Sequence, residues 1–219
     1  MLPNLNQHIK LKGLLSLVLG FIIVVGGYAW FIQTPYFLSF KTWAEQNFIV
    51  FSFFLLIAKI VGIIIPPVPG GLFTLGAIPI IGWWQAYIID FVGLMIGSSI
   101  AFFLGKRYGR KLLLYFFDKA LVEKIEKTKI KQNRQVESLF VLRVLAGSTL
   151  TEIVCYAAGL LKISFKNFLI GTALSHLVIG IPMFYLANNL LEMKNLWMSL
   201  VTLVIAILFF WKLKGRYIE

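Results

Sequence analysis

Acidic residues, histidine and cysteine are scarce in this chain of 219 residues, and each scarcity excludes a class of chemistry. The only two histidines, His8 and His176, have no clustered carboxylates beside them, so no metal-ligand spacing is present. The single cysteine, Cys155, cannot form a disulfide within the chain. No Walker loop and no hydrolase nucleophile elbow occurs. We therefore expect neither an enzyme nor a bound metal or cofactor.

Apolar residues, by contrast, dominate the composition. They make up 59% of the chain, and the mean hydropathy is +0.86. Soluble globular domains are only about 45–50% apolar, so the composition predicts an all-helical, polytopic membrane protein. Basic residues outnumber acidic ones by 21 to 9. Cytoplasmic loop bias and attraction to an anionic membrane surface explain this excess better than nucleic-acid binding does.

The long apolar runs can be sorted by length, because a helix needs about 20 residues to cross a bilayer core. The runs at 14–32, 83–105, 168–187 and 196–213 are predicted to span the membrane. The run at 48–65 is borderline, and the run at 72–81 is too short. The first run follows two lysines as in a signal peptide, but no cleavage site follows it, so we expect a retained span.

Three prolines, Pro66, Pro67 and Pro69, and the two adjacent glycines that follow interrupt the middle of the apolar stretch "IIIPPVPGGLFTLGAIPI" at 63–80. The prolines, of which Pro69 is the last, lack N–H donors and end the incoming helix. Gly70 and Gly71 then permit a turn and expose the first N–H groups of the next helix, which suits an anion. Broken backbone at membrane depth is tolerated only where it is buried in protein or lines a wet cavity. The stretch therefore predicts a cavity.

A second interrupted stretch, "LRVLAGSTLTE" at 142–152, suggests an inverted repeat. Each interrupted hairpin is re-entrant and is followed by a transmembrane helix; the first hairpin enters from outside and the second from inside. Paired broken helices of this kind mark midplane binding sites in transporters. The competing interpretation is a proline kink between ordinary spans at 48–65, 72–89 and 91–105. It gives the same loop orientation but leaves the last span short.

Positive charges set the predicted orientation. With both termini in the cytoplasm, seventeen of the 21 basic residues lie inside, ten of them in the polar stretch 106–137. That stretch fits either an amphipathic interfacial helix or a solvated linker helix. We divide the chain into an N-terminal transmembrane helix with an external connection (1–47), a core (48–190), and a C-terminal transmembrane helix with a basic tail (191–219).

Five ionisable residues lie within predicted membrane segments, where charge is costly and usually functional. They are Lys59, Asp90, Arg143, Glu152 and His176. Arg143 is the strongest candidate for binding a substrate. It precedes the second break, whose Gly147 would face the first break, and a guanidinium can hold a phosphate through two hydrogen bonds.

The other four residues have alternative roles. Asp90 and Glu152 are the available proton-linked groups, and Lys59 and His176 are candidate buried partners. Asp90 could simply pair with Lys59, and His176 could be an interhelical hydrogen-bonding residue. Glu152 follows Thr149 at capping-box spacing, so it could instead close the start of a helix.

The interrupted segments resemble the DedA family, also called the VTT or SNARE-associated Golgi protein domain, over roughly 48–190. The similar segments are "PVPGGLF", "GLMIGSSIAFFLGKRYGRKL" and "LFVLRVLAGSTLTEIVCYAAGLLKISFKNFLIGT". The matched positions are Pro69, Gly70, Gly105, Arg143, Gly147 and Gly159. The resemblance implies a plasma (inner) membrane protein that moves phospholipids or undecaprenyl phosphate between leaflets, as a flippase or scramblase, with a proton-motive-force link.

Departures from the family pattern favour a divergent, scramblase-like branch. Many members have acidic residues where this chain has Gly71 and Ser98, and a proline where it has Ala146. Two other functions stay open from the residues, namely an ion or small-solute secondary transporter on the same scaffold and a non-transporting membrane scaffold. A homo-oligomer also stays open.

Overall fold

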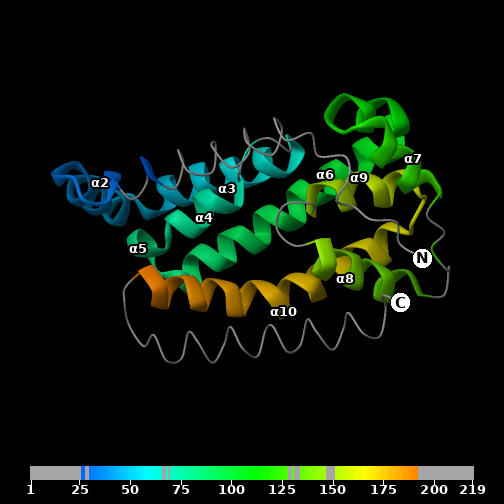
Figure 1. Ribbon diagram of the computed structural model, residues 1–219. Coiled ribbons are helices and arrows are strands. Elements are labelled where there is room, and N and C mark those ends of the chain that lie inside the picture. The colour runs from blue at the N-terminus through cyan, green and yellow to red at the C-terminus, as the bar shows by residue number, and fades with distance from the viewer. Residues whose placement is uncertain are drawn as a thin grey trace.

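The computed structural model describes residues 26–27, 30–65, 68, 70–127, 130, 134–146 and 151–191, and the chain is all-helical within them (Figure 1). The helices are α2 (Pro35–Gln46), α3 (Phe48–Ile64), α4 (Gly70–Gly76), α5 (Ile78–Ile81), α6 (Trp83–Phe116), α7 (Lys119–Lys127), α8 (Gln135–Ala146), α9 (Thr151–Leu160) and α10 (Phe165–Leu191). Most of the predicted span at 14–32, the whole of 196–213, Pro69 and Gly147 lie outside the described residues.

Two helices in the described part are long and apolar enough to cross a membrane, namely α6 with 34 residues and α10 with 27. Helix α6 starts directly after Gly82, whose φ of 85° ends the preceding short helix, and it continues without a break through Asp90. The proline-kink interpretation, which divides this region into spans at 72–89 and 91–105, is therefore wrong. The helix also passes its predicted end at 105 and kinks only at Gly109. The chain is a membrane protein, and its described part is all-helical.

The first interrupted stretch forms short helices rather than a span. Helix α3 ends at Ile64, just before the prolines, and the apolar segment Gly70–Ile81 that follows is too short to cross a bilayer. Helix α2 meets α3 at an angle of 103°, and together they could form one broken span. In Figure 1, α6 runs through the centre of the molecule, with α3 on one side and α10 on the other.

Glycines let α9 pack directly on α6. A Cβ at Gly105 would lie 2.3 Å from the carbonyl oxygen of Tyr156, and a Cβ at Gly159 would lie 2.1 Å from that of Phe102. No side chain fits at either position, so the two backbones touch, as in small-residue packing between membrane helices. This contact fixes the second interrupted segment against the central helix.

The polar stretch 106–137 also packs on the protein. Helix α7 buries Val122 completely, in the same core cluster as Phe102 and Tyr156. Arg110 on α6 pairs with Glu126 and lies 3.6 Å from Glu123 on α7. Helix α7 thus docks on the end of α6 through one apolar residue and these ion pairs.

Candidate functional site

A buried charge cluster joins α3, α4, α6 and α10. The ammonium of Lys59 lies 2.5 Å from Asp90 Oδ1, and the hydroxyl of Thr74 donates to the same oxygen at 2.5 Å. His176 Nε2 lies 3.2 Å from Asp90 Oδ2, within ion-pair distance though outside hydrogen-bond geometry. Lys59 is 8% exposed and Asp90 is 2% exposed. Each charge is therefore compensated inside the protein, as a buried charge must be.

Small residues and aromatic rings position these groups. A Cβ at Gly93 would lie 2.6 Å from Lys59 Cγ, so only glycine lets the lysine stem cross α6. The ring of Tyr87 stacks on His176, with centroids 5.4 Å apart and planes 4° apart, and Phe91 covers the imidazole at 5.8 Å. The imidazole is thus held in one orientation toward Asp90.

A second buried cation lies on α8. Arg143 is 4% exposed, and its Nη1 donates to Cys155 Sγ on α9 at 3.3 Å, a weak acceptor. Its other terminal nitrogen, Nη2, is buried without a hydrogen-bond partner among the residues that the structure describes. Glu152 lies one helical turn before Cys155 and interacts electrostatically with Arg143. The two side chains do not form an ion pair at contact distance. Within the described residues, Arg143 therefore has unused hydrogen-bonding capacity.

The two clusters lie close to each other. The hydroxyl of Tyr156 on α9 donates to the carbonyl oxygen of Ile64, the last residue of α3, at 2.5 Å. Glu152 also interacts electrostatically with both Lys59 and Arg143. The end of the first interrupted segment is thus adjacent to the second, and one carboxylate is near the cations of both.

The clusters occupy matching positions in their helices. Asp90 is the eighth residue of α6, and Thr172 is the eighth residue of α10. Likewise, Thr74 and Cys155 are each the fifth residue of their short helices, α4 and α9. Thr172 is fully buried, and its hydroxyl has no partner in the described part of the chain. The position of α10 that matches Asp90 of α6 therefore carries a neutral hydroxyl group.

Comparison with known proteins places this geometry in a family. The family model of the VTT domain matches residues 67–189, more than half of the chain and most of both clusters. The chain belongs to the VTT-domain (DedA) family. An uncharacterised protein of Methanocaldococcus jannaschii is 27% identical over 119 residues, which are 52% of this chain and 70% of that protein. No solved structure matches the chain. The sequence resemblance to this family is confirmed.

At the first glycine pair of this VTT-domain protein, one N–H group of the predicted anion site is used within the chain. Gly70 donates its N–H to the carbonyl oxygen of Val68 at 2.8 Å, so that N–H is not free for an anion. The two glycines pack closely, because a Cβ at Gly62 would lie 2.5 Å from Gly70 Cα and a Cβ at Gly70 would lie 3.1 Å from Gly62 Cα. Gly71 is exposed, and a Cβ on it would lie 3.9 Å from Lys59 Nζ. Gly71 therefore lies beside the first cation.

Sequence reasoning missed three residues of these clusters, namely Thr74, Tyr87 and Tyr156. Single hydroxyl groups are common in membrane helices, so their residue type carries little signal alone. Their position relative to the breaks is the better signal, since Thr74 and Tyr156 both lie within two turns of one. Among the described residues, no three His, Cys, Asp or Glu side chains gather as metal ligands would.

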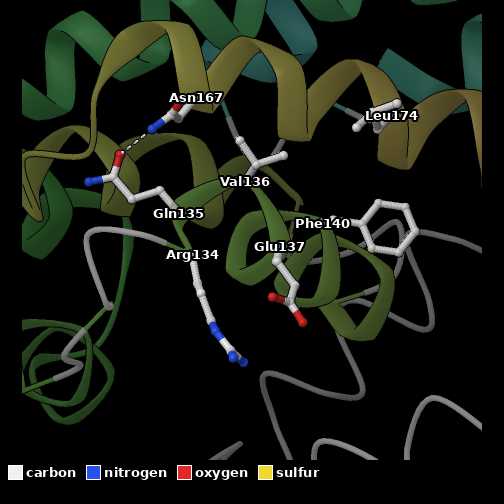
Figure 2. A pocket seen from close by; sticks show the side chains of 7 residues that line it. All are labelled: Arg134, Gln135, Val136, Glu137, Phe140, Asn167 and Leu174. Atoms are coloured by element: carbon white, nitrogen blue, oxygen red, sulfur yellow. Dashed lines mark hydrogen bonds between the residues drawn. The ribbon is translucent and has the colours of Figure 1, made fainter.

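A separate cavity of about 410 Å³ lies between the start of α8 and α10 (Figure 2). It is lined by Arg134, Gln135, Val136, Glu137, Phe140, Asn167 and Leu174. Gln135 accepts hydrogen bonds from Asn167 Nδ2 at 2.9 Å and from the Ser164 N–H at 3.1 Å, which holds α8 against the start of α10.

Proposed function

We propose that this VTT-domain protein moves a lipid with a phosphate headgroup, either a phospholipid or undecaprenyl phosphate, between the leaflets of the plasma membrane. The observation that carries the proposal is the buried Arg143 guanidinium, whose Nη2 has no partner among the described residues. A buried cation with an unsatisfied donor is costly at membrane depth and is rarely kept there without a function. A lipid phosphate would supply the missing acceptors.

The difference between the two clusters supports Arg143 as the phosphate-binding cation. Lys59 already has Asp90 at 2.5 Å, whereas Arg143 donates only to the Cys155 sulfur among the described residues. A phosphate that crossed the bilayer alone would lose its hydration at a large cost. At Arg143 the loss is offset by charge-assisted hydrogen bonds, while the lipid tails stay in the bilayer.

In this proposal the segments α3 to α5 and α8 to α9 are inverted re-entrant hairpins that meet within the membrane, and α6 and α10 are the spans that follow them. The matching positions of Asp90 and Thr172, and of Thr74 and Cys155, support such a repeat. Both termini are cytoplasmic in this arrangement, and the basic face of 106–137 meets anionic headgroups. Of the two proton-linked candidates, Asp90 and Glu152, it is Glu152 that interacts electrostatically with both cations.

Transport in liposomes tests the proposal. The full chain is reconstituted with a fluorescent phospholipid or with undecaprenyl phosphate, and the accessibility of the lipid to a membrane-impermeant reagent is followed. Arg143→Gln should abolish transbilayer movement, and Arg143→Lys should retain part of it because the charge is kept. Arg110→Gln, which alters an exposed ion pair, is the matched control. Movement at the wild-type rate in Arg143→Gln would contradict the proposal.

One observation favours a second function, ion or small-solute secondary transport. The compensated chain of Lys59, Asp90 and His176 is of the kind that relays protons in transporters. A flux assay with the purified protein separates the two functions. If Asp90→Asn stops a proton-driven solute flux while lipids stay in their leaflets, the second function is supported and lipid transport is not.

A further inference from the structure

Cys155 on α9 holds one end of the Arg143 guanidinium. Its sulfur accepts a hydrogen bond from Nη1 at 3.3 Å, and the side chain is completely buried. It belongs to the core cluster that also contains Phe102, Tyr156 and Phe168. Nη1 is thus fixed against the packed core, whereas Nη2 is buried without a hydrogen-bond partner among the described residues. The two terminal nitrogens of one cation therefore have different surroundings.

A thiol can orient a cation without compensating its charge. The sulfur of a neutral cysteine is only a weak acceptor, whereas a carboxylate forms charge-assisted hydrogen bonds that are roughly twice as strong as neutral ones. Lys59 shows the second case, because the Asp90 carboxylate lies 2.5 Å from its ammonium. Arg143 is 4% exposed, and the acceptor that holds its Nη1 is the neutral one. The charge of Arg143 stays available to an anion from outside the chain.

The helix around Cys155 makes the sulfur a rigid support. Tyr156, the next residue, donates a hydrogen bond to the last carbonyl of α3. One turn further on, a Cβ at Gly159 would lie 2.1 Å from the Phe102 carbonyl oxygen, so the backbones of α9 and α6 touch. The sulfur cannot move away from Arg143 unless these contacts are broken. The orientation of Nη1 is therefore set by the packing of α9.

We propose that Cys155 is a positioning residue for Arg143: it holds Nη1 so that Nη2 meets a phosphate oxygen of the lipid headgroup. This inference rests on the proposed function, since it concerns how the same guanidinium binds its phosphate. A long side chain loses rotamer freedom when a ligand orders it, and that loss weakens binding. Because the bond to sulfur orders Arg143 beforehand, the loss is smaller at the moment of binding.

Calorimetric titration of the detergent-purified full chain with dioctanoyl phosphatidic acid, a short lipid with a phosphate headgroup, tests the inference. Cys155→Ala removes the acceptor and should weaken binding by roughly three- to tenfold, as for the loss of one hydrogen bond. Cys155→Val also lacks an acceptor but leaves no cavity, and it should weaken binding similarly. Cys155→Ser keeps an acceptor and should bind within about twofold of the wild type.

A neighbouring position separates positioning from a merely structural role. Val154→Ala removes apolar atoms from a partly buried side chain of the same helix, and it should leave the affinity unchanged. In liposomes, Cys155→Ala should raise the lipid fraction that gives half-maximal movement and leave the maximal rate nearly unchanged, because the sulfur assists binding only. Circular dichroism verifies that each variant is folded.

The outcomes distinguish this inference from the proposed function. Wild-type affinity in folded Cys155→Ala or Cys155→Val, or an equal loss of affinity in Val154→Ala, would overturn the positioning role and leave lipid transport standing. Dioctanoyl glycerol, which lacks the phosphate, is the reference ligand. If the wild type binds dioctanoyl phosphatidic acid no better than this reference, the proposed function fails and the positioning role fails with it.

Discussion

The hydroxyl of Tyr156 donates to the carbonyl oxygen of Ile64 at 2.5 Å, across 92 positions of sequence. Ile64 is the last residue of α3, where helix carbonyls lack intrahelical partners. The bond therefore satisfies the end of the first interrupted segment with a donor from the second. It also holds the surroundings of Lys59 next to those of Glu152 and Arg143.

Tyr156→Phe should destabilise the protein by about 1–2 kcal/mol, because the Ile64 carbonyl is left without its donor while the ring stays packed. Thermal unfolding in detergent measures the change. Tyr115→Phe, at a side chain that is 82% exposed, is the matched control and should have no measurable effect. Equal unfolding temperatures for the two variants would show that the bond contributes nothing to the contact between the segments.

Lys59→Met should destabilise the protein by roughly 3–5 kcal/mol, since it leaves the buried Asp90 carboxylate without its closest cation. The double variant Lys59→Met/Asp90→Asn removes both charges and should recover most of that loss. Denaturant unfolding monitored by tryptophan fluorescence measures both changes. Lys41→Met, from an exposed pair with Glu45, is the control and should cost less than about 1 kcal/mol. A double variant no more stable than the single one would argue against a compensated pair.

Gly159→Ala should separate α9 from α6, because a Cβ there meets the Phe102 carbonyl oxygen at 2.1 Å and backbone cannot rotate aside. We expect a loss of at least about 1–3 kcal/mol, as for overpacked cores. Gly71→Ala is the comparison, since its Cβ would have only one contact, 3.9 Å away. Both are compared by thermal unfolding and by yield of monodisperse protein. Tolerance of alanine at 159 would mean that the helices do not touch as described.

Thr172→Asp should slow lipid movement, because it puts a carboxylate at the buried position of α10 that matches Asp90 of α6, where it competes with a lipid phosphate for cations. Thr172→Asn has nearly the same shape and no charge, so it should keep transport. The liposome assay and thermal unfolding are run on both variants. Transport by the aspartate variant at the rate of the asparagine variant would remove the argument from matching positions.

The cluster around Lys59 and Asp90 shows which contacts could be predicted from the sequence and which could not. Lys59 and Asp90 lie 31 residues apart on neighbouring segments, so their pairing could be considered from the sequence. The addition of His176 and Thr74 to that pair could not, because it depends on how α10 and α4 pack against α6. Gly70 was expected to offer an N–H group to an anion, but the close approach of Gly62 and the bond to Val68 use it for packing instead.

The sequence alone determined that this is a helical membrane protein with α6 and α10 as long apolar helices, because helix length and hydropathy are local properties. It also located the first interruption, since proline and glycine act on their own backbone. Only the tertiary structure decided that Asp90 compensates Lys59, while Thr172 stands at the matching position on α10 and Arg143 keeps an unpartnered nitrogen within the described residues. Charge compensation depends on distances between segments, and these are set by the packing of glycine faces.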